Sequence, residues 1–315
     1  GSAAGAAECR TVAGQTARQG QTGEIPLKTK SLVLAAVVLL ALSGCSSTTL
    51  DLPAVTAQAT GTRLPGKVIW HDLVTADPAA AQRFYGGLFG WTFKPFGGDY
   101  TLIMHQGEVI GGMVDARIFK RQVNLSQWVI ALSVADLDRA LATVRQAGGA
   151  VLGGPAEAGA RGRLAVVRDP QGATVTLLQT RDSDPLDREA AVGDFMWHEL
   201  WTSNPAAATA FYRQLASYTS GYHALADGSR YGYLQSDGRP RAAIIANPLP
   251  GLAPTWVGYV KVADADATSA RVPGLGGTIL LPSQASKVGG ELAVIADPTG
   301  AGLIIQTWNA EQQEH

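Results

Sequence analysis

Two closely similar stretches, "VIWHDLVTADPAAAQRFY" from Val68 to Tyr85 and "FMWHELWTSNPAAATAFY" from Phe195 to Tyr212, show that the chain repeats itself. Each contains a tryptophan, a histidine, a carboxylic acid and a leucine in that order, and each ends in Phe-Tyr. The agreement continues in "LAVVRDPQGATVTLLQ" from Leu164 and "LAVIADPTGAGLIIQ" from Leu292. Solenoid repeats usually have periods of roughly 20–50 residues. These copies are longer, so the sequence predicts a duplicated domain.

Each copy contains one order of predicted elements twice: a strand, a helix and three further strands. Residues 68–75 form the first predicted strand. Asp77-Pro78 then favours a helix start, because Asp caps exposed N–H groups and Pro in the first turn loses no hydrogen bond. An apolar stripe with helical spacing follows, and it consists of Ala81, Phe84, Tyr85 and Leu88. The order recurs from residue 128, so we expect four βαβββ units, with Pro273 shortening the last helix.

These elements, with the "DP-A-A-A-x-x-FY" helix, the "FGW" after it and the "DPxG" final turn, resemble the vicinal oxygen chelate superfamily. That superfamily includes glyoxalase I, bleomycin-resistance proteins and extradiol dioxygenases. The resemblance implies an α+β fold with two tandem glyoxalase-like domains, at residues 67–184 and 190–310, with curved mixed sheets and helices on the outer faces. Because the superfamily contains both enzymes and pure binding proteins, it leaves open whether this chain is an enzyme.

Composition excludes some classes of partner. The 315 residues carry a net charge of −1 and contain no Lys/Arg-rich block, whereas binding to nucleic acid needs a basic surface. The two cysteines, Cys9 and Cys45, both precede the predicted domains. We therefore expect neither a disulfide framework nor a cysteine-based zinc site in the body of the protein.

The segment 27–44 has the pattern of an export signal. Lys28 and Lys30 precede the apolar run Leu32–Leu42, which is shorter than the roughly 20 residues that span a bilayer as a helix. Leu42-Ser43-Gly44-Cys45 resembles the lipobox of bacterial lipoproteins, in which the cysteine is lipidated. The alternative is an uncleaved anchor or a buried helix with a chance cysteine. The resemblance implies an exported cell-envelope lipoprotein, on the periplasmic face or in the outer membrane if the cell is Gram-negative.

Two segments around this signal receive separate interpretations. We expect residues 1–26 to be a cloning remnant or an upstream extension, because a signal normally begins a chain. Residues 45–66 contain the lipidation site, Cys45, and a stretch rich in Ser, Thr, Ala and Pro. That stretch lacks apolar periodicity, so we interpret it as a coil-like tether.

The positions at which metal-using relatives carry ligands hold unsuitable residues here. In those relatives the ligands lie on the first, fifth and last strands of a domain. The corresponding residues are Trp70, Val129 and Thr176 in one copy and Trp197, Val257 and Ile304 in the other. Tryptophan has only an N–H donor, and aliphatic side chains have no donor atoms. We therefore predict no metal and no other cofactor.

His71 and His198 lie one residue from these positions, which in a strand means the opposite face. We expect them to point away from the concave face, hydrogen-bonded between sheet and helix, unless a bulge shifts the register. That register shift is the route by which they would become metal ligands. We expect the remaining histidines, among them His105 and His223, to be ordinary surface residues.

The same alternation places Trp70 beside Asp72, and Trp197 beside Glu199, on the concave faces. An aromatic surface beside a carboxylate suits a small, partly aromatic or cationic ligand. The alternatives are that the two tryptophans only fill the cavities, and that the acids pair with nearby arginines. No residue here is assigned as catalytic, because one carboxylate in a cavity is weak evidence for acid–base chemistry.

Three functions remain open at this point. The first is metal-independent binding of a small molecule, as in bleomycin-resistance proteins. The second is a metal-dependent lyase or dioxygenase that uses His71 and His198. The third is a structural envelope protein whose cavities are filled by its own side chains. We also expect a monomer, because a duplicated chain completes internally the assembly that single-domain relatives form as dimers.

Overall fold

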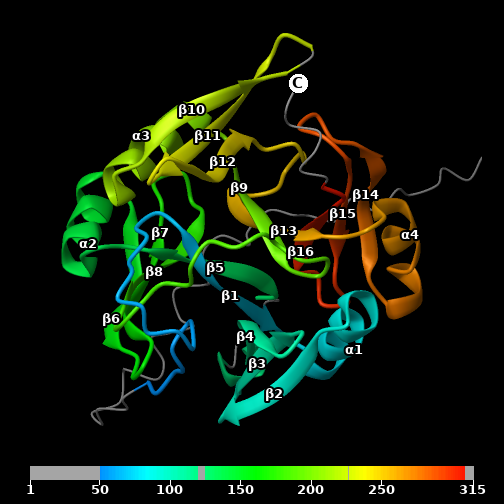
Figure 1. Ribbon diagram of the computed structural model, residues 1–315, viewed down its shortest axis with the longest axis horizontal. Coiled ribbons are helices and arrows are strands. Elements are labelled where there is room, and N and C mark those ends of the chain that lie inside the picture. The colour runs from blue at the N-terminus through cyan, green and yellow to red at the C-terminus, as the bar shows by residue number, and fades with distance from the viewer. Residues whose placement is uncertain (1–49, 120–124, 226, 309–315) are drawn as a thin grey trace, which may run out of the picture.

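The computed structural model describes residues 50–119, 125–225 and 227–308. These form two eight-stranded sheets with the same strand order (Figure 1). The first runs β2 (Thr92–Gly97), β3 (Tyr100–His105), β4 (Glu108–Asp115), β1 (Val68–Thr75), β5 (Gln127–Ser133), β8 (Thr174–Thr180), β7 (Gly162–Arg168), β6 (Ala150–Glu157). The second runs β10 (Thr219–Ala224), β11 (Arg230–Ser236), β12 (Arg239–Ala246), β9 (Phe195–Thr202), β13 (Thr255–Lys261), β16 (Gly302–Gln306), β15 (Glu291–Ala296), β14 (Thr278–Ala285).

Each sheet consists of two βαβββ units that meet at its centre. β1 pairs in parallel with β4 of its own unit and antiparallel with β5 of the next unit. The second sheet repeats this pattern with β9, β12 and β13. The predicted α+β class and the four tandem units are therefore confirmed.

The helices begin where capping residues predict. Asp77 accepts a hydrogen bond from the N–H of Ala80 at the start of α1 (Pro78–Phe89), and Asn204 does the same for Ala207 in α3 (Pro205–Ala216). The predicted effect of Pro273 is also confirmed. α4 (Ala265–Ala270) has 6 residues, against 10 in its counterpart α2 (Leu137–Gln146), and the short 3-10 helix η4 (Pro273–Leu275) follows it.

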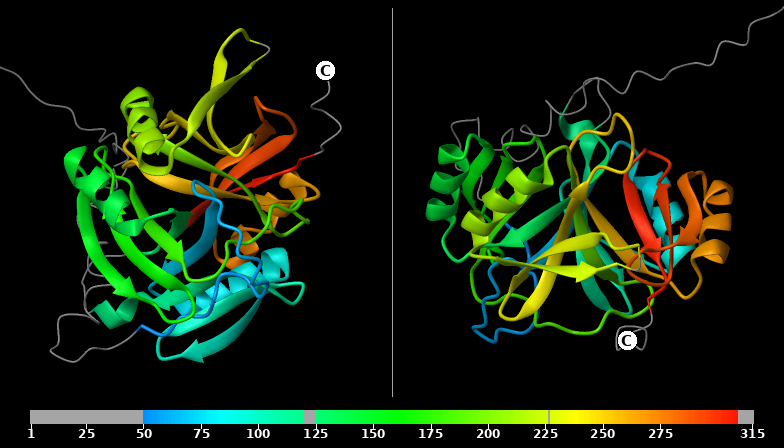
Figure 2. Two further views of the ribbon diagram at one scale, coloured as in Figure 1. Left: turned by 60° about the vertical axis from the view of Figure 1, so that its left-hand side comes forward. Right: turned by 90° about the horizontal axis from the view of Figure 1, so that it is seen from above.

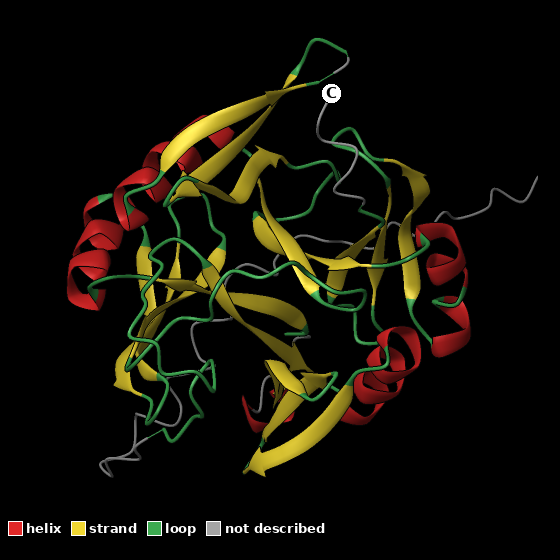
Figure 3. Cartoon of the chain, in the orientation of Figure 1, coloured by secondary structure: helices red, strands yellow, loops and turns green. Residues whose placement is uncertain are grey.

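The two copies join through their helix-covered faces. The helices lie outside the strands in two pairs, α2 beside α3 and α1 beside α4 (Figures 2 and 3). One core contains the apolar stripes of α2 and α3 with the sheet residues beneath them. A second core contains the apolar residues of α1 and α4 with the sheet residues beneath those helices. Each core therefore contains residues of both copies, so the copies bury apolar surface against each other. Monomeric behaviour in solution stays a prediction.

The tyrosine that ends each quoted stretch contributes to the interface between the two copies, which is called the joint below. Tyr212 of α3 accepts a hydrogen bond from the indole of Trp256 at 2.9 Å and donates to Asp169 of the other copy at 3.1 Å. Asp169 belongs to the "DPQG" turn before β8 and also accepts from three backbone N–H groups of that turn. Tyr85 occupies the equivalent place facing Asp297, and burial and that carboxylate raise its pKa.

The expectation of a free tether is wrong for residues 50–66. Leu52 and Val55 are 8% and 6% exposed and pack against the concave face of the first sheet. The N–H of Gly61 donates to Ser183, and that of Leu64 donates to Asp184. A few apolar and backbone contacts suffice to hold a short segment, and they leave no periodic pattern in the sequence. The signal 27–44, Cys45 and residues 1–26 lie outside the described residues.

Candidate functional site

The strand alternation predicted for the repeated motif is confirmed. The indole N–H of Trp70 donates to Asp72 at 3.0 Å, which requires the two side chains to share one face of β1. His71 lies on the other face, where its Nε2 is 2.8 Å from Nε2 of His198. The concave faces therefore hold the tryptophans and acids, and the interface between the copies holds the histidines.

A hydrogen-bonded cluster surrounds the carboxylate of the first copy. The hydroxyl of Tyr100 on β3 donates to Asp72 at 2.6 Å and accepts from Trp70 at 3.0 Å. Burial and the charge of Asp72 raise the pKa of Tyr100, so this hydroxyl keeps its proton and remains a donor. Arg161, which is 2% exposed, donates to the same hydroxyl and lies 3.9 Å above the Trp70 ring. A cation at this distance from an indole face is attracted by the ring.

The second copy repeats the arrangement around Glu199, which is 4% exposed. The Tyr231 hydroxyl on β11 donates to Glu199 at 2.6 Å and accepts from Trp197 at 2.8 Å. The indole of Trp201 donates to the other carboxylate oxygen at 2.8 Å. The Tyr259 hydroxyl also hydrogen-bonds Glu199, and burial with the charge of that acid raises its pKa.

The segment before β1 closes the first concave face. Leu52 and Val55 belong to one apolar cluster with Trp70 and Leu164. The guanidinium of Arg161 donates to the carbonyl of Pro53 at 3.0 Å, and the backbone of Leu52 pairs with the turn around residue 159. The side chains of the chain itself thus cover Trp70, where a ligand was expected, whereas Asp72 is only partly buried.

The second concave face retains solvent access. Trp70, Ile69 and Leu164 are 2%, 5% and 5% exposed under their cover. Their counterparts are only partly buried at the edge of the corresponding cluster, and they are Trp197, Met196 and Leu292. Of the two expected ligand sites, the structure therefore leaves the tryptophan of the second, Trp197, partly exposed, whereas Glu199 itself is buried.

The residues at the metal-ligand positions do not fit a metal. Trp70 lies level with Ala131 and Thr176 across β1, β5 and β8, so the fifth-strand position is Ala131, two residues along the same face from Val129. In the second sheet the corresponding row is Trp197, Tyr259 and Ile304. Three protein ligands of His, Glu, Asp or Cys type are typical of a catalytic metal. Within the described part of the chain, no three such side chains come together.

His71 and His198 form a pair between the copies, in which His198 is 7% exposed and His71 is partly buried. Nδ1 of His71 faces the carbonyl of Ile110 at 3.2 Å and therefore carries the proton. In neutral His71 the Nε2 is then an acceptor, so His198 donates through its Nε2–H. Burial lowers the pKa of His71 to about 4 and that of His198 well below its ordinary value. The side chain of Phe195 stacks on His71 with ring centroids 3.8 Å apart. The pair is a neutral element of the joint.

The expectation that His105 is a surface residue is wrong. His105 is 8% exposed, and its Nδ1 lies 2.7 Å from a carboxylate oxygen of Asp194, which precedes β9. The other oxygen of Asp194 pairs with Arg188. The histidine thus ties the first copy to the connection between the copies. His223, by contrast, is exposed on β10.

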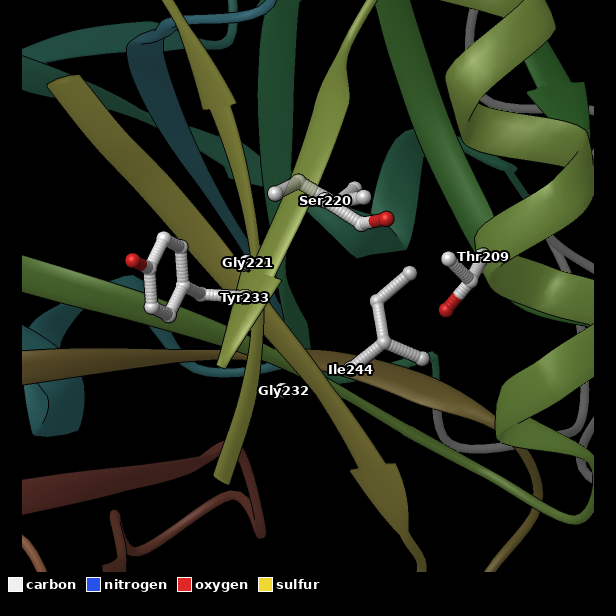
Figure 4. Close-up of a pocket in the computed structure, with 7 residues that line it drawn as sticks. Thr209, Ser220, Gly221, Gly232, Tyr233 and Ile244 are labelled. Atoms are coloured by element: carbon white, nitrogen blue, oxygen red, sulfur yellow. The ribbon is translucent and has the colours of Figure 1, made fainter. Parts of the chain in front are cut away.

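A small hollow elsewhere in the molecule is not a ligand site for an organic molecule. It lies between α3 and the strands β10 to β12, and its lining includes Thr209, Ser220, Tyr233 and Ile244 (Figure 4). Its volume is about 50 Å³. Pockets for organic ligands usually measure about 300–1,000 Å³.

The sequence analysis missed five residues of the two clusters: Tyr100, Arg161, Trp201, Tyr231 and Tyr259. The tyrosines on β3 and β11 are equivalent, because each lies one hairpin away from its carboxylate in the same register. The signal existed in "YTLIM" and "YGYLQ", but the connection before β11 is longer and changes the offset of the repeat. Arg161 has no counterpart in the second copy and left no repeat signal.

Paired βαβββ units in eight-stranded sheets define the vicinal oxygen chelate class of fold, and comparisons with known proteins agree. A family model described as a glyoxalase-like domain matches residues 69–178. "Putative glyoxylase CFP32" of Mycobacterium tuberculosis (strain CDC 1551 / Oshkosh) is 32% identical over 238 residues, which cover 74% of this chain and 91% of that protein. The chain therefore belongs to the glyoxalase-like family of the vicinal oxygen chelate superfamily.

Further similarities cover much of the chain. "Anthracycline biosynthesis protein DnrV" of Streptomyces peucetius is 28% identical over 260 residues, or 76% of this chain and 93% of that protein. The Mn(II)-bound glyoxalase from Novosphingobium aromaticivorans has a TM-score of 0.54 at 17% identity, covering 78% of this chain and 83% of that one. A catechol 2,3-dioxygenase has a TM-score of 0.52 at 15% identity, covering 78% and 89%. At these identities the two structures show the shared fold alone.

Proposed function

We propose that this protein is an exported lipoprotein whose second concave face binds a small organic molecule without a metal. The proposal rests on the contrast between the residues at the metal-ligand positions and the polar groups around Glu199. The metal-ligand row holds Trp197, Tyr259 and Ile304, whereas a buried carboxylate, Glu199, lies beside a partly exposed indole. Apolar walls with a few oriented polar groups are typical of small-molecule sites. The similarity to a protein of anthracycline biosynthesis agrees with an aromatic ligand.

The first concave face supports a different role. Because Leu52 and Val55 cover Trp70, this copy corresponds to the structural alternative, in which the chain fills its own cavity. We propose that the first domain supports the second and contributes no ligand site. The chain as a whole would be monomeric, with its pseudo-symmetry internal.

A metal-dependent lyase or dioxygenase is the second candidate, and the relatives described as glyoxylases favour it. The route by which His71 and His198 would serve such an enzyme requires them on the concave faces. They lie instead at the joint, with their Nε2 atoms 2.8 Å apart. A metal enzyme would therefore need ligands other than these two histidines.

Elemental analysis distinguishes these candidates. We expect the purified protein, after incubation with zinc, iron or manganese and removal of excess ion, to retain no stoichiometric metal. The reason is that each candidate row offers at most a hydroxyl donor, whereas tight sites need about three suitable ligands. One tightly held metal per domain would contradict the proposal and favour the enzyme. Its loss in His71→Ala would additionally assign the histidine as a ligand.

The lipid anchor has its own test. Within the described residues, no helix is both long and apolar enough to cross a bilayer. We expect Cys45→Ala to abolish lipidation and to leave the signal uncleaved by the lipoprotein peptidase, because the modified thiol is missing. Metabolic labelling with a palmitate analogue and membrane fractionation would measure this, with Cys9→Ala as the matched control. Normal labelling and membrane retention of Cys45→Ala would overturn the lipoprotein assignment.

A further inference from the structure

Glu199 is a buried carboxylate that meets no cation among the described residues. It is 4% exposed, and its hydrogen-bond donors are the neutral groups of Tyr231, Trp201 and Tyr259. A buried charge without an opposite charge is costly, since each ion loses its hydration. The Glu199 carboxylate therefore has hydrogen-bond donors but no positively charged partner among the described residues.

In the first copy a side chain supplies the missing charge. Arg161 lies 3.9 Å above the ring of Trp70 and donates to the Tyr100 hydroxyl, which itself donates to Asp72. The guanidinium therefore stacks on the indole and is linked to the carboxylate through the Tyr100 hydroxyl rather than by a direct ion pair. The second copy contains the same hydrogen-bonded series of indole, hydroxyl and carboxylate, as Trp197, Tyr231 and Glu199.

Among the described residues of the second copy, no basic side chain stacks on Trp197 or pairs with Glu199. Alignment of Leu164 with Leu292 sets Gly289 at the position of Arg161. The nearest lysine of that turn, Lys287, is 72% exposed and pairs with Asp227 at 3.2 Å. Arg230, next to Tyr231, stacks instead over Tyr222 at 4.3 Å. In the second site, the position that Arg161 occupies in the first copy could therefore be taken by a bound cation.

We propose that the second concave face binds an organic cation, a primary ammonium or guanidinium with an apolar group, against Trp197 and beside Glu199 and Tyr231. Arg161 in the first copy is an internal equivalent of this ligand. The inference rests on the proposed small-molecule function and specifies its ligand class. The charged head would gain from the indole face and the carboxylate. The apolar part would cover Met196 and Leu292, just as Leu52 and Val55 cover the equivalent residues Ile69 and Leu164 in the first copy.

The stoichiometry follows from the closed first face. Arg161 and the segment around Pro53 fill the first site, so one cation should bind per chain. Titration calorimetry on the full-length protein tests this with phenethylamine and phenethylguanidine, and with 2-phenylethanol as a neutral molecule of similar shape. We expect saturable binding of the two cations at one site per chain, and at least about tenfold weaker binding of the alcohol.

Variants assign the site. Glu199→Gln should weaken cation binding by about tenfold or more, because it removes the charge. Asp72→Asn makes the matched change in the filled site and should leave the affinity unchanged. Trp197→Leu changes a partly exposed residue and should also weaken binding. This variant provides the test if circular dichroism shows that Glu199→Gln does not fold.

Equal affinity for 2-phenylethanol, or unchanged cation binding in both Glu199→Gln and Trp197→Leu, would overturn the cation assignment and leave small-molecule binding intact. Two sites per chain would overturn the role given to Arg161. A third outcome is that none of the three probes shows saturable binding at concentrations up to about 10 mM. That result would overturn both the inference and the proposed function, because any affinity would then be weaker than that of specific complexes.

Discussion

Replacing Asp169 by alanine is expected to lower the free energy of unfolding by about 3–5 kcal/mol. One carboxylate oxygen accepts from the N–H groups of Gln171, Gly172 and Ala173, and the other accepts from Tyr212 of the other copy. Asp169 is 3% exposed, so water cannot replace the carboxylate. The substitution would leave buried donors unsatisfied in the turn and at the joint together. Chemical denaturation followed by circular dichroism would measure the loss.

Two controls separate the turn from the joint. Asp169→Asn keeps an oxygen for the turn and should cost about 1 kcal/mol, the value of one modest hydrogen bond. Tyr212→Phe leaves the turn intact but removes both the contact between copies and the acceptor of the Trp256 indole. Asp297→Ala makes the equivalent change in the second copy, where the carboxylate accepts from the N–H groups of Thr299 and Ala301. Near-wild-type stability of Asp169→Ala would show that the turn does not depend on this acid.

Acid is expected to weaken the joint through the histidine pair. Folding lowers the pKa of His71 from 6.5 to about 4 by burial, and it lowers the pKa of His198 as well. Between these values the unfolded chain binds more protons than the folded one, so stability falls as pH falls. The contribution is complete above pH 6.5 and is lost progressively towards pH 4. A shift of this size corresponds to roughly 3 kcal/mol for His71 alone.

The matched variant removes both rings. His71→Leu/His198→Leu replaces a buried polar pair with apolar side chains and should lose this part of the pH dependence. His198→Leu alone leaves Nε2 of His71 without a donor, so it should be less stable than the double variant at pH 7. Denaturation at several pH values would compare the slopes. Parallel curves for the wild type and the double variant between pH 6.5 and 4 would contradict the assignment.

Local patterns in the chain predicted most of the fold. The repeat identified the duplication, the Asp-Pro and Asn-Pro pairs marked the helix starts, and Pro273 shortened α4. Strand alternation separated Trp70 and Asp72 from His71. These signals are readable because capping, helix termination and side-chain alternation each depend on residues close together in the chain.

The candidate site was only half predictable. Alternation identified the tryptophans and acids, but the tyrosines that bind those acids come from strands one hairpin away. The position of Arg161 above Trp70 depends on a turn 91 residues further along the chain. No local pattern encodes such a contact, because it arises only when the strands have paired.

By itself, the sequence determined the duplicated βαβββ architecture and the face on which each residue of the Trp-His-acid-Leu motif lies, while the absence of a metal stays a prediction. The tertiary structure decided how the two sites differ. It placed Leu52, Val55 and Arg161 over one concave face, whereas on the other Trp197 stays partly exposed and Glu199 meets no cation among the described residues. It also paired His71 with His198 and buried His105 beside Asp194. These outcomes depend on contacts between distant segments, whose free energies are set by the burial and the partners that only the folded chain provides.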